Sequence, residues 1–463
     1  MKIKNLHLLE GLCQLRLTGP IILAQLSQTA MGFVDTIMAG RVSPVDLAAV
    51  AVGASIFTPL FLFMVGLLSA VMPLVAQAHG RSDAKGMRTA MQQGLLTGVI
   101  TGIVLMFLLM SISPFLIWMD VNAAVIPLTE KYLFAVSLGF PITGLFLALR
   151  NGSDGFSKPR LSMFAGFVGL TVNVIANYIF IYGKFGIPAM GGVGCGWATS
   201  LSMLAMFIAM AFMLSKNRST ASLGLFNHLA PRLIRTIHIL LFLGLPIGLS
   251  LFVECSIFAV IALLISRLGA EIVAAHQVAL NFTSLLFMVP YSLSMALTVR
   301  VGFTIGRQQN RRLARVVKSG LTIALCCAII TCLFIITSAK YIAAMYTPDP
   351  DVQALAASLM IFAAFFQLPD AIQINCAGAL RGFKDTKIPM VLMVVAYWGI
   401  GLPIGYMLGL GELGGREQGP EGFWIGLICG LTASAFFLSR RLHKLLVEKT
   451  ALMQQNGSAQ KVQ

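Results

Sequence analysis

The sequence predicts an all-α integral membrane protein with twelve transmembrane helices in two six-helix lobes. Of its 463 residues, 57% are hydrophobic and 11% are charged, whereas a soluble domain carries roughly 25% charged residues. The mean hydropathy is +0.87. Apolar stretches of the length that crosses a bilayer as a helix, about 20 residues, recur along the whole chain. A soluble fold is therefore excluded.

Hydropathy separates the chain into twelve apolar spans whose ends are defined to within a few residues. They are 17–40, 47–78, 90–114, 126–149, 161–183, 188–214, 237–266, 273–303, 319–340, 351–379, 389–410 and 421–439. Several are longer than a bilayer requires, which predicts helices that tilt or extend beyond the membrane.

The basic residues predict the orientation of these spans. If both ends of the chain lie on one side of the membrane, that side holds 27 of the 33 Lys and Arg residues, and the other side holds 6. The positive-inside rule then places both termini in the cytoplasm. The net charge of +16 is thereby explained as a topology signal and as contact with anionic headgroups, so no nucleic-acid partner is needed.

Matching residues at an offset of 226 indicate an internal repeat. The pairs include Pro20 with Pro246, Ala48-Ala49 with Ala274-Ala275, Gly80-Arg81 with Gly306-Arg307, and Gly94 with Gly320. An even number of spans separates the halves, so the two repeats are parallel, as in several transporter folds. We expect an N-terminal lobe over 1–214, a cytoplasmic linker over 215–236, a C-terminal lobe over 237–449 and a polar, disordered tail over 450–463.

Three acidic residues fall inside predicted spans, namely Asp35, Glu254 and Asp370. A carboxylate at this depth costs a few kcal/mol or more, and such residues mark functional sites by default. No Lys or Arg falls deep in any span, so the expected partner is a proton, a metal cation or a cationic ligand. The alternative is an acid that only hydrogen-bonds neighbouring helices together.

In the first half, four polar residues are expected at similar depth. Asp35 lies 19 residues from Arg16, while Asn177 and Thr199 each lie 17 residues from the basic residue at their own inner span end. Asn173 and Asn177 share one helix face because they are four residues apart. Such a pocket suits a proton or a hard cation, and the alternative is polar contact between helices.

In the second half, Glu254 and Phe258 share a helix face. Glu254 and Asp370 differ in expected depth by about 12 Å on straight helices, so depth alone does not make them neighbours. Pro369 and Pro290 predict breaks or kinks beside Asp370 and near Phe287. Asp35 plus 226 is Ile261, so the acids of the two halves do not align.

The chain offers no support for catalysis. It has no nucleophile–base pair, phosphate-binding loop or metal-ligand spacing, and its eight Cys are expected to be free thiols in apolar spans. His276 is expected to be a hydrogen-bonded interfacial residue, with a proton relay as the alternative. We expect no enzyme activity, no cofactor, and no metal beyond a coupling ion.

Four stretches carry a resemblance to a known family: MGFVDTIMAG (31–40), YIFIYGKFGIP with GGVGCGWAT (178–199), VAAHQVALNF (273–282) and ALRGFKDT (379–386). They resemble the multidrug and toxic compound extrusion (MATE) transporters, and within them the bacterial NorM-type branch. The resemblance covers essentially all twelve spans.

This resemblance implies a cation-coupled antiporter that exports amphipathic cationic drugs, dyes and toxic compounds by alternating access. It implies that Glu254, Asp370 and the aromatic position Phe287 bind the coupling ion, usually Na⁺. It implies a second proton or cation cluster at Asp35, Asn173, Asn177 and Thr199. Substrate contacts are implied at Gln277, Phe258 and Asp35.

Several alternatives stay open at this point. The coupling ion is Na⁺ or H⁺, with Na⁺ favoured. A lipid-linked precursor flippase of related fold is less favoured, because it would need a basic cavity. We expect a monomer in the bacterial inner membrane whose partners are drugs, the coupling cation and lipid.

Overall fold

The computed structural model describes residues 3–112, 114, 116, 125–226, 233–411 and 418–459, and this part of the chain contains helices and no strands. Eleven described helices are long and apolar enough to cross a membrane. There are twelve if the bent pair α6 (Ile126–Ser137) and α7 (Phe140–Gly155) counts as one span. The predicted all-helical membrane fold is confirmed, and the chain is a multi-pass membrane protein.

The chain divides into two compact units. Unit 1 comprises Met1–Thr18 and Val253–Gln463, and unit 2 comprises Gly19–Phe252. These boundaries differ from those of the predicted lobes, because two helices pass from one unit to the other. They are α1 (Ile3–Gly40), which begins in unit 1, and α11 (Leu233–Ile265), which begins in unit 2.

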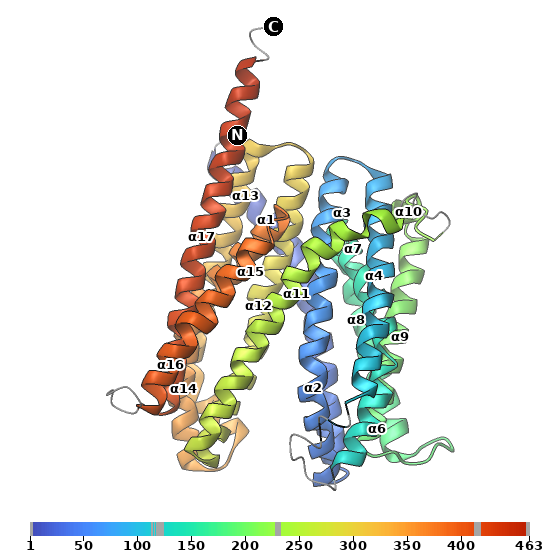
Figure 1. Ribbon diagram of the computed structural model, residues 1–463, viewed down its shortest axis with the longest axis vertical. Coiled ribbons are helices and arrows are strands. Elements are labelled where there is room, and N and C mark those ends of the chain that lie inside the picture. The colour runs from blue at the N-terminus through green and yellow to red at the C-terminus, as the bar shows by residue number, and fades with distance from the viewer. Residues whose placement is uncertain are drawn as a thin grey trace. The chain divides into compact units, whose positions relative to one another are not determined.

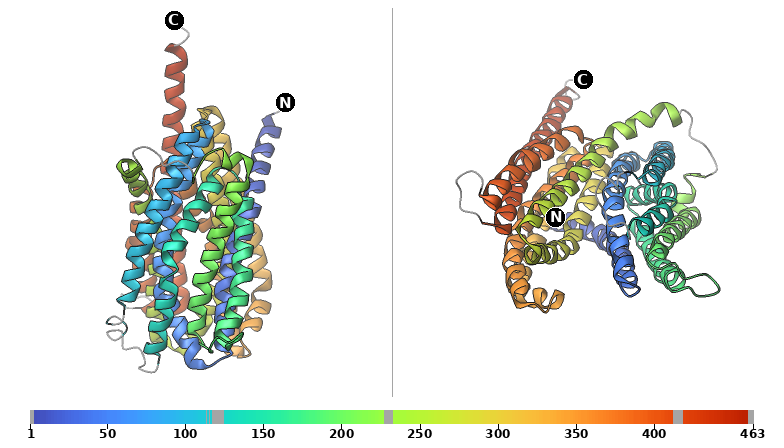
Figure 2. Two further views of the ribbon diagram at one scale, coloured as in Figure 1. Left: turned by 90° about the vertical axis from the view of Figure 1, so that its right-hand side faces the viewer. Right: turned by 60° about the horizontal axis from the view of Figure 1, so that its bottom comes forward.

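Unit 2 is built from the larger part of α1, the beginning of α11 and the helices between them (Figure 1). In addition to α6 and α7, these are α2 (Pro44–Ser69), α3 (Val71–Gly80), α4 (Ala84–Met110), α8 (Pro159–Tyr182), α9 (Val193–Lys216) and α10 (Arg218–Ala221). Both views show α8 and α9 running side by side (Figures 1 and 2).

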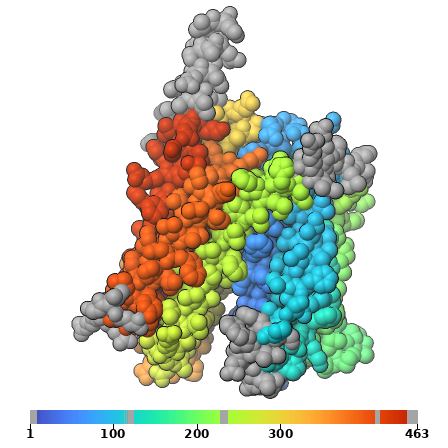
Figure 3. Space-filling model, viewed as in Figure 1, coloured from blue at the N-terminus to red at the C-terminus, as the bar shows by residue number. Residues whose placement is uncertain are grey.

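Unit 1 contains the rest of α11 and the helices that follow it. These are η1 (Ser266–Leu268), α12 (Ala270–Gly306), α13 (Asn310–Tyr346), α14 (Pro350–Gly382), α15 (Lys387–Val394), η2 (Val395–Gly401), α16 (Leu402–Leu410) and α17 (Pro420–Ala459). In the space-filling view α15, α16 and α17 lie on the visible side of this unit, coloured orange to red (Figure 3). The beginning of α1 and the end of α17 lie toward the same end of unit 1 (Figure 2).

Capping side chains and prolines mark the residues at which several helices begin. Ser43 caps α2 by accepting from the Asp46 backbone N–H at 3.0 Å, and Asp83 caps α4 by accepting from Gly86 N–H at 2.8 Å. Such side chains satisfy amide groups that have no partner within the helix. Proline occupies the first turn of α2, α8 and α14, where its missing N–H costs nothing.

Glycines let the helices of unit 2 approach closely. A Cβ on Gly98 of α4 would lie 2.5 Å from the Gly144 carbonyl oxygen of α7. A Cβ on Gly66 of α2 would lie 2.6 Å from the Gly248 Cα of α11. Small residues at such contacts are typical of membrane helices, which associate by close packing. The Gly66–Gly248 contact is the reason that the beginning of α11 belongs to unit 2.

The beginning of α1 is fastened to unit 1 by polar contacts. Glu10 is buried and accepts hydrogen bonds from Arg300 of α12 and Arg312 of α13. One helical turn later, Gln14 donates to the Val316 carbonyl at 2.8 Å. These contacts explain why the first 18 residues belong to unit 1, although they precede the first predicted span.

The predicted linker and the predicted disordered tail both contain helical segments. Within the predicted linker, Gln92 donates to the Leu225 carbonyl at 2.8 Å, and Leu223 and Leu225 are buried, so this part folds onto unit 2. Residues 227–232 lie outside the described part. The predicted disordered tail from Thr450 is wrong up to Ala459, because α17 continues through it. Residues 460–463 also lie outside the described part.

Each unit has its own apolar core. Large side chains such as Trp424 and Phe423 in unit 1 and Phe140 and Phe146 in unit 2 are fully buried. Many other large apolar side chains are exposed, as expected of helices that face lipid. They include Phe107, Phe212, Leu263, Ile330 and Leu333.

The close contact between α4 and α7 gives a stability prediction. Gly98→Leu should lower the unfolding free energy by about 1–3 kcal/mol, because an overpacked contact forces backbone shifts. The matched control is Gly32→Leu, since a Cβ at Gly32 meets nothing within 4 Å. Thermal unfolding of the detergent-purified proteins measures the difference. Equal melting temperatures for the two variants would contradict the close packing.

Candidate functional site

The four polar residues predicted in the first half form one hydrogen-bonded cluster. Asp35 of α1 is 7% exposed. Its Oδ1 accepts from Asn177 Nδ2 at 2.6 Å and from Asn173 Nδ2 at 3.1 Å. Its Oδ2 accepts from the Thr199 hydroxyl at 3.1 Å. The residues predicted at similar depth are therefore neighbours, and three neutral donors hold the buried carboxyl.

The geometry of this cluster follows from helix periodicity. Asn173 and Asn177 lie one turn apart on α8, and Asn177 Nδ2 also donates to Asn173 Oδ1 at 3.1 Å. The Cys195 thiol on α9 lies 3.6 Å from the Asp35 backbone oxygen. Asn177 Oδ1 is buried and has no hydrogen-bond partner in the described structure. This cluster can hold a proton on Asp35 or take a small cation.

A second polar cluster in unit 2 was missed by the sequence argument, which placed Arg150 at a span end. The Arg150 side chain is buried, and its guanidinium donates to Gln28 Oε1 at 2.6 Å and to Gln25 Oε1. It also lies 3.9 Å from Asp154, which accepts from Ser162 at 2.6 Å.

The number of buried acids therefore exceeds the predicted three. Asp154 is 1% exposed and Glu10 is 4% exposed, and both have arginine partners. The sequence signal was present in the four-residue spacing of Arg150 and Asp154, which puts them on one helix face.

In unit 1, Glu254 of α11 and Asp370 of α14 are close enough to interact electrostatically. Asp370 is 1% exposed. Glu254 Oε2 and Asp370 Oδ2 are both buried without a hydrogen-bond partner in the described structure. The estimate from straight helices, which separated the two acids by about 12 Å in depth, therefore does not describe this site.

The expectation that Glu254 has no basic neighbour is also wrong. Arg381, near the end of α14, is buried and interacts electrostatically with Glu254. It forms no ion pair within 4 Å with Glu254 among the residues that the structure describes. It therefore balances part of the charge without occupying the carboxylate oxygens.

A tyrosine that the sequence argument missed completes this group. The Tyr397 hydroxyl donates to Glu254 Oε1 at 3.3 Å and interacts electrostatically with Asp370. Tyr397 is 1% exposed. Its position in an apolar span gave no signal, since Tyr is also common in transmembrane helices as a packing or interfacial residue.

The aromatic residues near the two acids differ in part from those expected. Phe258, one turn after Glu254, packs edge-on against Phe366 with ring centroids 6.2 Å apart, and Phe366 lies one turn before Asp370. Phe287 instead stacks on Tyr291 at 5.7 Å. Phe366 is thus the aromatic ring on the same helix as Asp370, and the role implied for Phe287 stays a prediction.

The remaining predicted residues are placed separately. Gln277 is exposed and the neighbouring His276 is buried, with its ring 5.9 Å from that of Trp424. His276 was expected to be hydrogen-bonded, but both of its ring nitrogens are buried without a hydrogen-bond partner in the described structure. Gln277 and Phe258 belong to unit 1, while Asp35 belongs to unit 2. The implied substrate contacts stay predictions.

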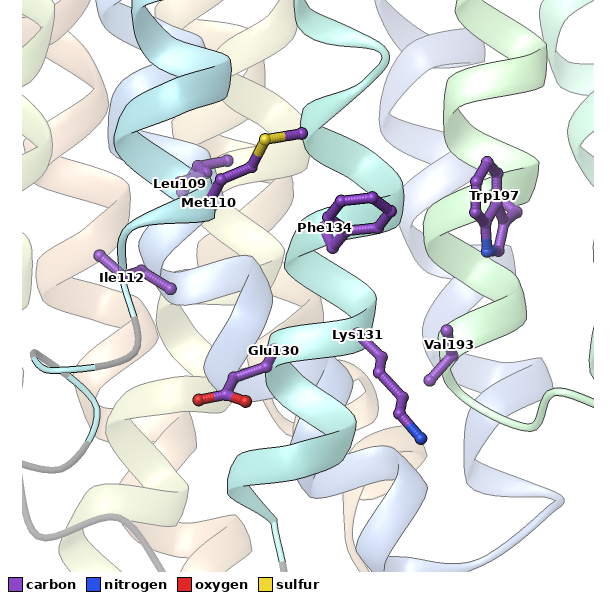
Figure 4. A pocket seen from close by; sticks show the side chains of 8 residues that line it. All are labelled: Leu109, Met110, Ile112, Glu130, Lys131, Phe134, Val193 and Trp197. Atoms are coloured by element: carbon purple, nitrogen blue, oxygen red, sulfur yellow. The ribbon is translucent and has the colours of Figure 1, made fainter.

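A hollow of about 470 Å³ lies in unit 2, at the end of α4 and beside α6 and α9 (Figure 4). Its lining residues are Leu109, Met110, Ile112, Glu130, Lys131, Phe134, Val193 and Trp197. Glu130 and Lys131 point to different sides of it in Figure 4. None of the predicted site residues lines this hollow, so it is not the predicted drug site.

The chemistry of both acid sites suits a proton or a monovalent, hard cation. In the described part of the chain, no three His, Cys, Asp or Glu residues are grouped so that they could hold a metal ion. Transition metals prefer imidazole and thiolate ligands, whereas hard cations take carboxylate, amide and hydroxyl oxygens. The Asp35 cluster and the Glu254–Asp370 pair offer oxygens of the second kind.

Comparison with known proteins identifies the family. The MatE family profile matches residues 20–179 and 246–407. "Multidrug resistance protein PmpM" of Pseudomonas aeruginosa is 47% identical over 429 residues, covering 92% of this chain and 90% of that protein. "Probable multidrug resistance protein NorM" of Shewanella oneidensis is 44% identical, covering 94% and 96%.

Solved structures that share this fold are also described as MATE transporters. The crystal structure of the eukaryotic MATE transporter AtDTX14 superimposes with a TM-score of 0.87 at 18% identity, covering 96% of this chain and 99% of that one. A structure described as MATE in the bent conformation gives a TM-score of 0.85 at 20% identity, covering 98% and 99%. On the family match and on these bacterial relatives, this chain belongs to the MatE family, in the branch of the NorM-like proteins.

Proposed function

We propose that this protein is a cation-coupled antiporter that exports amphipathic cationic drugs, dyes and toxic compounds. Its bacterial relatives are named as multidrug resistance proteins. The observation that carries the proposal is the buried pair Glu254 and Asp370, whose Oε2 and Oδ2 atoms have no hydrogen-bond partner among the described residues. Buried carboxylates with free oxygens require a positive ligand to offset their desolvation.

Coupling follows from competition for the same negative charge. A cation bound between Glu254 and Asp370 neutralises the pair and lowers its affinity for a cationic drug. A ligand shifts a conformational equilibrium only by its differential affinity for the two states. Ion and drug therefore favour different states of the transporter, and an ion gradient drives drug export by alternating access.

Na⁺ is the favoured coupling ion because the Glu254–Asp370 group offers oxygens from several side chains. The Asp35 cluster supports H⁺ as the second candidate, since three neutral donors surround one carboxyl that can carry a proton. A lipid-linked precursor flippase is disfavoured, because Arg150 and Arg300 are engaged by carboxylates or amides. The buried Arg381 interacts electrostatically with Glu254.

We place the protein in the bacterial inner membrane with both termini in the cytoplasm, as the distribution of Lys and Arg predicts. We propose that it acts as a monomer, as a transporter rather than an enzyme.

Neutralising either acid of the pair should abolish coupled export. In everted vesicles with Na⁺ concentrated in the lumen, Glu254→Gln and Asp370→Asn should reduce ethidium transport to the rate of vesicles without the protein. Glu271→Gln is the matched control, because Glu271 is an exposed acid in the same unit, and it should transport like the wild type. Wild-type rates from either buried variant would refute the proposal.

A protonophore separates the two coupling ions. With the proton gradient collapsed, an imposed Na⁺ gradient should still drive ethidium transport by the purified protein in liposomes. Asp35→Asn should retain this Na⁺-driven component if the Glu254–Asp370 pair carries the coupling. Complete loss of transport in the wild type under these conditions would instead assign coupling to H⁺ and to the Asp35 cluster.

A further inference from the structure

The eleventh predicted span, 389–410, contains a π-helical segment at its centre. Residues 395–401 form η2, a π-helix between α15 and α16. Such segments are rare and occur frequently at functional sites. Two features favour it here. Pro403 has no N–H to donate to the Gly399 carbonyl, and Gly401 approaches α17 closely enough for a Cβ to lie 3.2 Å from the Gly426 oxygen.

This segment delivers the Tyr397 hydroxyl to the two acids. Tyr397 is 1% exposed, and its hydroxyl donates to Glu254 Oε1 at 3.3 Å. It also interacts electrostatically with Asp370. Three oxygen-bearing side chains, from α11, α14 and η2, therefore form one group within unit 1.

Two carboxylate oxygens of this group accept no hydrogen bond from the described part of the protein. A tyrosine hydroxyl has one hydrogen to donate and two lone pairs to offer, and its hydrogen is directed at Glu254. Glu254 Oε2 and Asp370 Oδ2 are buried and lack hydrogen-bond partners in the described structure. The two acids alone provide too few ligands for a hard cation, which takes about six or more oxygens in the case of Ca²⁺.

Arg381 is the other charged group that acts on this site. It interacts electrostatically with Glu254 and with Tyr291, but it belongs to no ion pair within 4 Å in the part of the chain that is described. It therefore leaves the free carboxylate oxygens open to a ligand.

We propose that the Tyr397 hydroxyl is a ligand of the Na⁺ ion that binds between Glu254 and Asp370, and that it makes this site favour Na⁺ over H⁺. In the empty site the hydroxyl donates to Glu254. When Na⁺ is bound, the phenol oxygen turns a lone pair toward the ion. A proton on Glu254 needs no further oxygen ligand, whereas Na⁺ gains one from the hydroxyl. This inference rests on the proposed function of the two acids.

The test removes only the hydroxyl. Tyr397→Phe in purified, nanodisc-embedded protein should raise the apparent Kd for ²²Na⁺ about tenfold, which corresponds to about 1.4 kcal/mol, because the ion loses one oxygen ligand. Tyr341→Phe is the matched control, because Tyr341 is 77% exposed on α13 of the same unit, and its Kd should equal that of the wild type.

Two further measurements exclude a merely structural effect. In Na⁺-free buffer Tyr397→Phe should melt within a few degrees of the wild type. The rise in melting temperature on adding Na⁺ should be smaller than in the wild type, because a ligand stabilises the folded state according to its affinity. A lower melting temperature in Na⁺-free buffer together with a wild-type Na⁺-dependent rise would show a packing role and would overturn the assignment of Tyr397 as an ion ligand.

The remaining outcomes separate this inference from the proposed function. Wild-type ²²Na⁺ affinity in Tyr397→Phe, together with loss of Na⁺-driven export in Glu254→Gln, would overturn the role of Tyr397 and keep the antiporter proposal. If the wild type binds no ²²Na⁺ that depends on Glu254, the Na⁺ site and the role of Tyr397 both fail.

Discussion

The structure depends on how the desolvation cost of each buried carboxyl is offset inside an apolar helical protein. A carboxylate without partners in such surroundings is expensive, and this chain uses three kinds of compensation. Arginines hold Glu10 and Asp154. Neutral donors hold Asp35. Glu254 and Asp370 each keep one buried oxygen without a hydrogen-bond partner in the described structure, and neither forms an ion pair within 4 Å there.

The internal repeat allows the polar residues at equivalent positions of the two halves to be compared. At the offset of 226, Glu254 corresponds to Gln28, and at the offset of 227, Arg381 corresponds to Asp154. In unit 2, Gln28 and Asp154 both contact Arg150. In unit 1, Glu254 and Arg381 interact with each other. Equivalent positions thus belong to a polar group in both halves, but in unit 2 a third residue, Arg150, contacts both of them.

Departures from regular helices position the site residues. The bend of 43° between α6 and α7 occurs beside Pro141, and the π-helix η2 occurs beside Pro403. Proline removes a backbone donor, and the neighbouring glycines allow the backbones to approach. At η2, Tyr397 lies within the π-helix and its hydroxyl donates to Glu254.

The sequence by itself determined the membrane fold, the parallel repeat and the residues of the Asp35 cluster. These follow from hydropathy, from equal spacing to the basic span ends and from the period of a straight helix, all of which are local properties. Only the tertiary structure decided that Glu254 and Asp370 interact, that Tyr397 joins them, and that Arg150 and His276 are buried. These contacts join residues far apart in the chain through a π-helix and helix packing, and neither can be derived from the spacing along an ideal helix.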